Sequence, residues 1–273
     1  MALPQLVETV LASPKYAAIE PGLVYRLGAE ELGKRRSLKA AVKATKDRLH
    51  QVAGAYLEHR PDYLRWLQRL RSAADDGGIE ALKPLCCELL AQHTSSRERL
   101  PYLETFYAET LAGLPSVRSV LDLACGLNPL AIPWMPLAPG ATYRACDIYT
   151  DLAAFLAQAL PLLGVVGNAY PCDIVAAPPQ QPVDLALLLK TLPCLERLER
   201  GAGRRLLDAL QARYILVSFP ARSLGGRQKG MPENYEAYFR GLVAGKDWPI
   251  RRFELGTELA FLVEVDRGES RSR

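Results

Sequence analysis

The sequence has few of the residues that metal centres and acid–base catalysis require. Only 3 of its 273 residues are histidine, at positions 50, 59 and 93. The 6 cysteines form no C-x-x-C pair and no cluster with histidine, so the spacing gives no support to a zinc site. No Ser/His/Asp or Cys/His arrangement is evident either. We therefore expect no metal and assign no catalytic acid or base.

Long hydrophobic runs are also missing. No apolar stretch approaches the roughly 20 residues of a membrane span, and the N-terminus lacks the architecture of a signal peptide. Hydrophobic residues make up 49% of the chain, which is enough to bury a sizeable core. Since cysteines beside apolar runs behave as small buried hydrophobes in a reducing compartment, we expect a cytoplasmic protein without a membrane partner.

Acidic residues are scarce in one part of the N-terminal half. Residues 34–71 contain 11 Lys or Arg against 3 Asp or Glu, a formal charge of +8, whereas the whole chain carries +4 and the remainder therefore −4. Within this segment Ser37 to Tyr56 has helical periodicity, with Ser37 as a plausible N-cap. Its expected buried stripe consists of Leu38, Val42, Thr45, Leu49, Val52 and Tyr56.

A stripe of lysines runs beside that buried stripe. Lys39, Lys43 and Lys46 repeat at helical spacing, one step round the helix. Such a stripe is often no more than a solvated surface. Nearly acid-free helices of this kind also suit a polyphosphate such as RNA.

A second helical stretch follows Pro61. Its expected inward side chains are Leu64, Leu67 and Leu70, and its expected outward ones are Arg65, Arg69 and Arg71. The sequence Asp-Asp-Gly-Gly at 75–78 predicts a break.

From about Leu114 the pattern changes to alternating strands and helices. Strands are expected at 117–124, 141–147, 165–172, 183–189 and 214–219, with a helix at 150–163 capped by Thr150 or Asp151. A hairpin of 250–255 and 258–265 follows, turning at Gly256-Thr257. We predict an α/β fold with a mixed, seven-stranded Rossmann-like sheet, the methyltransferase variant. A helical domain would span 1–110 and the sheet domain 111–273.

Ligands of such sheets bind at the carboxyl ends of the strands. Gly126 follows the first strand, where a small residue permits close backbone approach or simply forms a βα turn. Asp147 ends the second strand, 21 residues later, and suits the hydroxyls of an adenosine ribose or the cap of the next helix. Asp173 ends the third strand and could accept from an adenine amino group or form a turn.

The fourth and fifth strands end in cationic segments. Lys190 follows the fourth strand and is either a cation of the site or a rim lysine. The segment 218–231 holds Arg222, Arg227 and Lys229, three glycines and no acid after its strand, which favours anion binding over a merely solvated loop. An acceptor with its own lone pair, such as guanine N7, needs no general base, only alignment and exclusion of water.

Four long motifs resemble one family. HTSSRERLPYLETFY (93–107), LDLACGLNPLAIPW (121–134), LLLKTLPCLE (187–196) and SFPARSLGGRQKGM (218–231) are similar to the 16S rRNA (guanine(1405)-N7)-methyltransferases that confer aminoglycoside resistance. TKDRLHQVAGAYL (45–57) matches the N-terminal domain of that family. The resemblance covers nearly the whole chain, and the joint occurrence of the motifs in order is highly specific.

The resemblance implies S-adenosyl-L-methionine (SAM) as cofactor and the 30S subunit, with its 16S rRNA, as substrate. Arg99 would hold the methionine carboxylate of SAM through its planar fork. Asp147 would bind the ribose, and Leu198 stands where the family often has Gln. The remaining cofactor contacts would be Tyr56, His93, Thr94, Ser95, Ala124, Gly126, Asp173, Ile174 and Leu189.

The resemblance also implies an RNA-binding set. Basic helices would grip phosphates, and the 218–231 segment would surround a flipped guanine. The predicted RNA contacts are Lys39, Lys43, Lys46, Lys190, Arg222, Arg227 and Lys229. Two other hypotheses stay open at this point: a methyltransferase of another RNA site or a small molecule, and a catalytically silent RNA-binding protein on the same fold.

Overall fold

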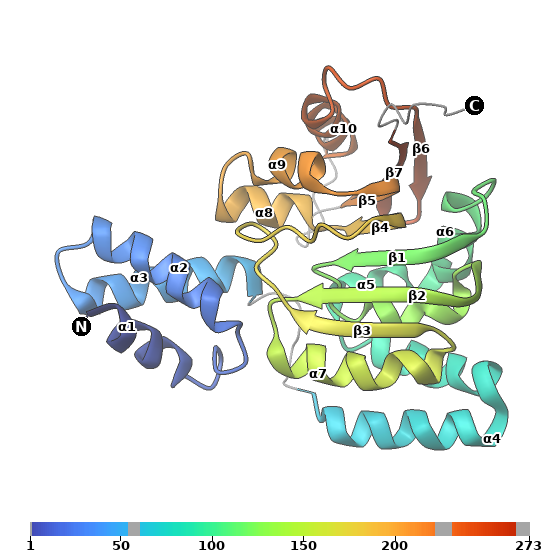
Figure 1. Ribbon diagram of the computed structural model, residues 1–273, viewed down its shortest axis with the longest axis horizontal. Coiled ribbons are helices and arrows are strands. Elements are labelled where there is room, and N and C mark those ends of the chain that lie inside the picture. Colours follow the sequence, from blue (N-terminus) through green and yellow to red (C-terminus); the bar gives the residue numbers. More distant parts are fainter. Residues whose placement is uncertain (1, 54–60, 222–230, 266–273) are drawn as a thin grey trace.

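The computed structural model describes residues 2–53, 61–221 and 231–265, which form a sheet covered by helices on both faces and a helical module at one end (Figure 1). The seven strands lie in the order β3-β2-β1-β4-β5-β7-β6. Strands β1 to β5 pair in parallel, and β7 joins β5 antiparallel as part of a hairpin with β6. The predicted mixed Rossmann-like sheet is confirmed.

The strands match their predicted positions closely. Their bounds are β1 Val117–Leu123, β2 Leu137–Asp147, β3 Val166–Pro171, β4 Val183–Leu189, β5 Ala212–Pro220, β6 Ile250–Leu255 and β7 Glu258–Glu264. The continuous apolar run of β4 reflects burial on both faces. Leu185 and Leu187 belong to one hydrophobic core, whereas Ala186 and Leu188 belong to the core across the sheet.

Two helical layers sandwich the sheet. One core joins the sheet to α4 Tyr63–Leu90, α6 Leu103–Thr110, α7 Thr150–Ala159 and the 3-10 helices η2 Asn128–Trp134 and η3 Leu160–Leu163. The short α5 Thr94–Arg99 and η1 Leu100–Tyr102 connect α4 to α6. The opposite core joins it to α8 Leu192–Leu198, α9 Ala202–Ala209 and α10 Met231–Leu242.

Three N-terminal helices form a module with its own small core. They are α1 Ala2–Leu11, α2 Pro21–Lys34 and α3 Leu38–Ala53. Ser37 caps α3 as predicted, since its Oγ accepts from the backbone N–H of Ala40 at 3.2 Å. Thr45 and Leu49 are fully buried on the predicted inner stripe.

The packing divides the chain earlier than residue 110. Helices α4 and α6 contribute Leu70, Leu89 and Phe106 to the core beneath the sheet, not to the core of α1–α3. Residues 63–110 therefore belong to the sheet domain by packing. Helicity alone does not reveal which core a helix joins, so the expected division after residue 110 needs this correction.

Three local expectations also need correction. Leu64 is 76% exposed, because the inner face of α4 runs through Tyr63 and Leu67 and leaves Leu64 outside it. Thr150 does not cap α7, since its hydroxyl donates to the Ala18 carbonyl oxygen. The predicted helix at 150–163 is split into α7 and η3. The predicted break at 75–78 is confirmed by the non-helical backbone of Gly77 and Gly78 within α4.

The module is attached to the segments that follow the strands. An antiparallel bridge links Ile19 to Tyr149, and the N–H of Thr150 donates to the Ala18 carbonyl at 2.8 Å. Arg26 of α2 forms an ion pair with Asp173 after β3 at 2.7 Å. Figure 1 shows the module facing the carboxyl ends of β1, β2 and β3. Among the described residues no helix has the length and apolarity needed to cross a membrane.

Two leucines of α4 provide a matched test of this packing. Leu70→Ala is expected to lower the free energy of unfolding by about 2–5 kcal/mol, because its side chain is fully buried. Leu64→Ala, on the same helix, is expected to change it by less than about 0.5 kcal/mol. Chemical denaturation of both variants measures the difference, and equal losses would contradict the assigned helix face.

Candidate functional site

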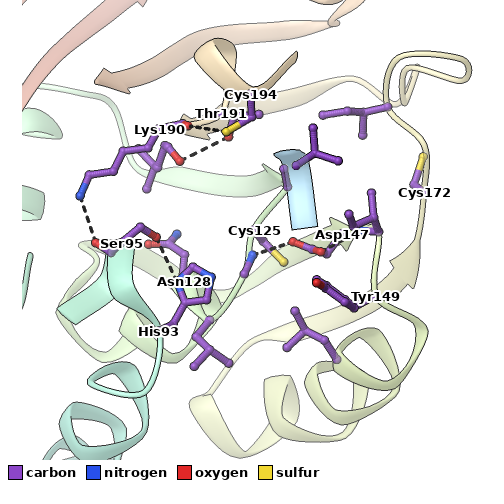
Figure 2. Close-up of a pocket in the computed structure, with 18 of the residues that line it drawn as sticks. His93, Ser95, Cys125, Asn128, Asp147, Tyr149, Cys172, Lys190, Thr191 and Cys194 are labelled. Atoms are coloured by element: carbon purple, nitrogen blue, oxygen red, sulfur yellow. Dashed lines mark hydrogen bonds between the residues drawn. The ribbon is translucent and has the colours of Figure 1, made fainter. Parts of the chain in front are cut away.

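A cavity lies at the carboxyl ends of the parallel strands, between the sheet and the module. It has an empty volume of about 1130 Å³, part of which is open to solvent. Residues that follow β1, β2, β3 and β4 line it together with α5 and α8, and Leu23 and Val52 of the module close one side. Figure 2 shows His93 and Ser95 on one side of the cavity and Asp147 and Tyr149 on another. This is the position at which α/β sheets bind ligands.

The backbone after β1 is shaped for close approach. Gly126 has a φ of 49°, and a Cβ there would lie 3.0 Å from the His93 ring. Ala124 has a φ of 50°, which is uncommon for a residue with a side chain. Both residues line the cavity. A strained, small-residue loop of this kind leaves the backbone open to a ligand.

Asp147 ends β2 with its carboxylate at the cavity wall. Its Oδ2 accepts from the N–H of Gly126 at 2.9 Å, and its Oδ1 accepts from the N–H of Ile148 at 2.7 Å. Burial raises the pKa of Asp147, although these backbone donors act in the opposite direction. The N–H of Tyr149 is a third backbone donor to this carboxylate, so one of its four lone pairs remains for a ligand hydroxyl. Asp147 is not the N-cap of α7, whose cap position is Tyr149.

Asp173 and Ile174 line the cavity next to the module. The Oδ1 atom of Asp173 accepts from the N–H of Val175 at 3.1 Å, so the turn interpretation holds. Its Oδ2 accepts from Arg26 of α2 at 2.7 Å. The carboxylate predicted to contact adenine therefore also anchors the module.

Arg99 is committed to a buried ion pair. Its Nε and Nη2 each donate to Glu258 at 2.8 Å, and its Nη1 donates to Asn128 at 2.9 Å. Arg99 is 3% exposed and Glu258 0%. Burial alone would raise the pKa of Glu258, but Arg99 and Lys190 outweigh it and hold the pKa below its usual value. The fork predicted for the methionine carboxylate thus already holds Glu258, and at most two of five N–H groups remain.

Lys190 does not lie on a basic surface. It is 8% exposed, lines the cavity, and has a φ of 58°. Its ammonium lies 2.6 Å from Glu98, 3.4 Å from Glu258 and 3.2 Å from the carbonyl oxygen of Ser95. Lys190 is therefore a cation of the cavity wall and not a rim lysine, with its donors facing α5 and β7, and its RNA contact stays a prediction.

A polar chain extends from Arg99 into the sheet. The Oδ1 atom of Asn128 accepts from Arg99 and from Tyr107 at 2.6 Å, while its Nδ2 donates to Asp122 at 2.9 Å. The same Oδ2 of Asp122 accepts from Tyr143 at 2.7 Å. Burial raises the pKa of Asp122 to about 6, although both hydrogen bonds act to lower it. These contacts fix the amide orientation of Asn128 and with it Arg99.

His93 lies against the loop after β1. Burial and the nearby Lys190 and Arg99 lower its pKa to about 4, so the imidazole is neutral at pH 7. Its Nδ1 lies 3.0 Å from the Oγ of Ser95. Thr94, predicted beside the cofactor, begins α5 but does not line the cavity, whereas His93 and Ser95 do.

The other predicted residues fall into three groups. Leu189 and Leu198 line the cavity. Lys39 and Lys43 are exposed on α3, whereas Lys46 is partly buried and donates to Ser13. The last group lies outside the described residues and comprises Tyr56, Arg222, Arg227 and Lys229.

Sequence reasoning missed several residues of the site. Asn128 lies two positions after Gly126, and its polar side chain in that loop was the available signal. Glu258 lies 159 positions from Arg99, and no local pattern connects them. Leu23 and Val52 carry only helix periodicity. In the described ranges no group of three or more His, Cys, Asp or Glu side chains is arranged to hold a metal ion.

Comparisons with known proteins agree on one family. A family model described as ribosomal RNA methyltransferase (FmrO) matches residues 12–263. The chain is 40% identical to the 16S rRNA (guanine(1405)-N(7))-methyltransferase of Micromonospora rosea, covering 95% of each protein. It is 42% identical to that of Frankia casuarinae over 96% of this chain and 93% of the relative.

Solved structures give the same result. The 16S rRNA methyltransferase RmtF, in complex with S-adenosyl-L-homocysteine, matches with a TM-score of 0.80 and 31% identity over 97% of this chain and 98% of that one. The 16S rRNA methylase RmtB matches with a TM-score of 0.74 and 32% identity over the same shares of the two chains.

Asp122 should leave a pH signature in stability. Its folded-state pKa of about 6 exceeds the ordinary value of 3.8, so stability falls as pH rises between these values and the ionised group opposes folding above them. Asp122→Asn keeps an oxygen for Asn128 and Tyr143 but carries no charge. We expect it to raise the free energy of unfolding by up to about 3 kcal/mol at pH 7.5.

The gain should shrink as pH falls below the unfolded-state pKa of 3.8, where the wild-type carboxyl becomes protonated in both states. Urea unfolding at several pH values measures it, with Asp76→Asn as an exposed control. A stability difference between Asp122→Asn and the wild type that does not change with pH would refute the assignment.

Proposed function

We propose that this chain, which belongs to the ribosomal RNA methyltransferase (FmrO) family, transfers the methyl group of SAM to guanine N7 in the decoding site of 16S rRNA. Relatives that share its full length are named for this reaction at guanine 1405. Methylation of the assembled 30S subunit in the cytoplasm would give resistance to aminoglycosides. The observation that carries the proposal is the cavity at the strand ends, with Asp147 and the open Gly126 backbone at one side and Arg99 at the other.

The residues of the cavity fit SAM. Asp147 has a lone pair left for a ribose hydroxyl, and the backbone of Ala124 and Gly126 is open beside it. Ile174 and Leu198 offer apolar contact to an adenine ring, next to the Asp173 carboxylate. SAM carries its methyl group on a sulfonium, which makes that carbon electrophilic. Since His93 is neutral, its ring adds no positive charge to a cavity that must accept this cation.

The methionine end of SAM would lie at the charged side of the cavity. Arg99 still has N–H groups besides those given to Glu258 and Asn128, and the Ser95 hydroxyl is close by. Glu258 holds the guanidinium in place and balances both Arg99 and Lys190. A cation held this rigidly loses little conformational entropy when a carboxylate binds.

Methyl transfer to guanine N7 requires alignment of the reacting atoms but no general base. Guanine N7 has a lone pair in the plane of the ring and carries no proton that must be removed. The site therefore needs to place N7 in line with the methyl carbon and sulfur and to keep water away. The rigid loops after β1 and β4, each with a non-glycine residue at positive φ, are suited to holding that geometry.

The N-terminal module would bind the RNA backbone. Lys39 and Lys43 are exposed on α3, whose other face carries Val52 to the cavity. A phosphate-binding helix would thus also form part of the cofactor cavity wall. Strand β5 ends at the same edge of the sheet as the cavity, and the segment that follows it in the sequence, with Arg222, Arg227 and Lys229, would surround the flipped guanine.

Methyl transfer tests the function directly. We expect purified protein to move labelled methyl from SAM into 30S subunits, with the modified guanine located by primer extension after borohydride and aniline treatment. Expression should give resistance to gentamicin and kanamycin. SAM binding without transfer into 30S subunits would overturn the proposal.

Asp147→Asn tests the cofactor assignment. Both carboxylate oxygens accept backbone N–H groups, so an amide must set its NH₂ against one of these donors. We expect S-adenosyl-L-homocysteine affinity to fall by about 1.5–3 kcal/mol in calorimetry. Unchanged affinity would remove Asp147 from the site.

Charge reversal on α3 tests the substrate class. Lys39→Glu with Lys43→Glu is expected to abolish most methylation of 30S subunits, with the largest deficit relative to wild type at low salt, because exposed phosphate contacts are lost. Cofactor affinity should not change. Arg118→Glu, an exposed substitution at the amino end of β1, is the control. Full activity of the double variant would favour a small-molecule substrate.

A further inference from the structure

A second basic surface lies outside the lysine stripe of α3. Residues 197–205, from the end of α8 to the middle of α9, contain 4 Arg and 1 Glu. All four arginines are exposed. This concentration stands out because the chain beyond residues 34–71 carries a net negative charge.

Two of these arginines have no carboxylate partner in the described part of the chain. Glu199, the acid within the segment, pairs with Arg205 and with Arg26. Glu196, just before it, accepts from the N–H groups of Gly201 and Gly203 at 2.9 and 3.1 Å. The ion pairs of the described residues therefore include neither Arg200 nor Arg204.

The turn that carries Arg200 is rigid. Gly201 has a φ of 79°, and the two bonds to Glu196 clamp the turn between α8 and α9. Gly203 packs so closely that a Cβ there would lie 3.2 Å from Glu196 and from Tyr238. Arginines presented by a fixed turn lose less entropy on binding than those of a loose loop.

The same turn adjoins the module. Arg48 of α3 donates to the carbonyl oxygen of Leu198 at 3.0 Å, and Arg26 of α2 reaches Glu199 at 3.3 Å. Arg200 is the next residue along the chain. Helix α3 also packs against α8, as Figure 1 shows. The turn thus places Arg200 where the sheet domain meets the module.

Helix α8 connects this turn to the cavity. Its residues Cys194, Leu195 and Leu198 line the cavity. An RNA strand that enters the cavity with one nucleotide has its neighbouring phosphates near the rim. Exposed guanidinium groups next to that rim match those phosphates in charge and in planar, two-donor geometry.

We propose that Arg200 and Arg204 form a second phosphate-binding surface, which holds the RNA backbone of the substrate together with α3. The inference rests on the proposed function and adds a specific surface of the sheet domain to it. Its ligand is the sugar–phosphate backbone, so it contributes affinity and register but no base recognition.

The test is the salt dependence of RNA binding by the full chain. For wild type and for Arg200→Gln with Arg204→Gln, the association constant for 30S subunits is measured over a series of KCl concentrations. The double variant is expected to bind several-fold more weakly and to reduce the slope of log K against log [KCl] by about 1 for each arginine.

Controls separate this surface from folding and from the cofactor site. S-adenosyl-L-homocysteine affinity and the midpoint of thermal unfolding should match wild type, since neither arginine lines the cavity or a core. Arg118→Gln removes the same charge from an exposed site at the amino end of β1 and should leave the slope unchanged. Equal slopes for the double variant and wild type would overturn the inference.

Two further outcomes are distinguishable. Weaker binding to 30S subunits with an unchanged salt slope would mean that the turn contacts a ribosomal protein, which also overturns the inference. A wild-type chain that binds S-adenosyl-L-homocysteine but does not methylate 30S subunits would defeat the proposed function itself. If the wild type is active and the double variant is fully active as well, only the inference about the second phosphate-binding surface is overturned.

Discussion

The buried pair of Arg99 and Glu258 is the constraint on which the site depends. It ties α5 to the first residue of β7, and Lys190 adds the end of β4 to the same carboxylate. Removing one partner of such a pair leaves a charge without compensation and costs about 3–5 kcal/mol. The antiparallel hairpin that ends this fold is therefore more than a sheet edge. It supplies the Glu258 carboxylate, which balances the charges of Arg99 and Lys190 in the wall of a largely apolar cavity.

The second constraint is that the cavity belongs to two cores. One side of the cavity is built from segments after β2 and β3, and the module holds both through Tyr149 and Asp173. A ligand there touches Leu23 and Val52 as well as the sheet. Cofactor and RNA would consequently meet through a few side chains of α2 and α3, so that binding of either favours the same placement of the module.

Local sequence patterns predicted the helices and strands well, but they predicted poorly which parts of the chain these pack against. The apolar run of β4 and the Gly256 turn of the hairpin identify a doubly covered strand and a closing pair. Asp147 and Gly126 could be chosen because strand ends converge in parallel sheets. The inward prediction for Leu64 failed because the stripe of α4 that packs against the core is centred on Tyr63 and Leu67, and the boundary at 110 failed because α4 packs beneath the sheet.

The sequence by itself determined the class of sheet, the cavity loops and, through four motifs, the family, because each depends on residues close together in the chain. Only the tertiary structure decided that Glu258 takes the fork of Arg99, that Lys190 points into the protein, and that Asp173 anchors the module. These outcomes depend on groups more than 90 residues apart, brought together by the packing of both cores. Burial then sets their charge balance, which no local spacing encodes.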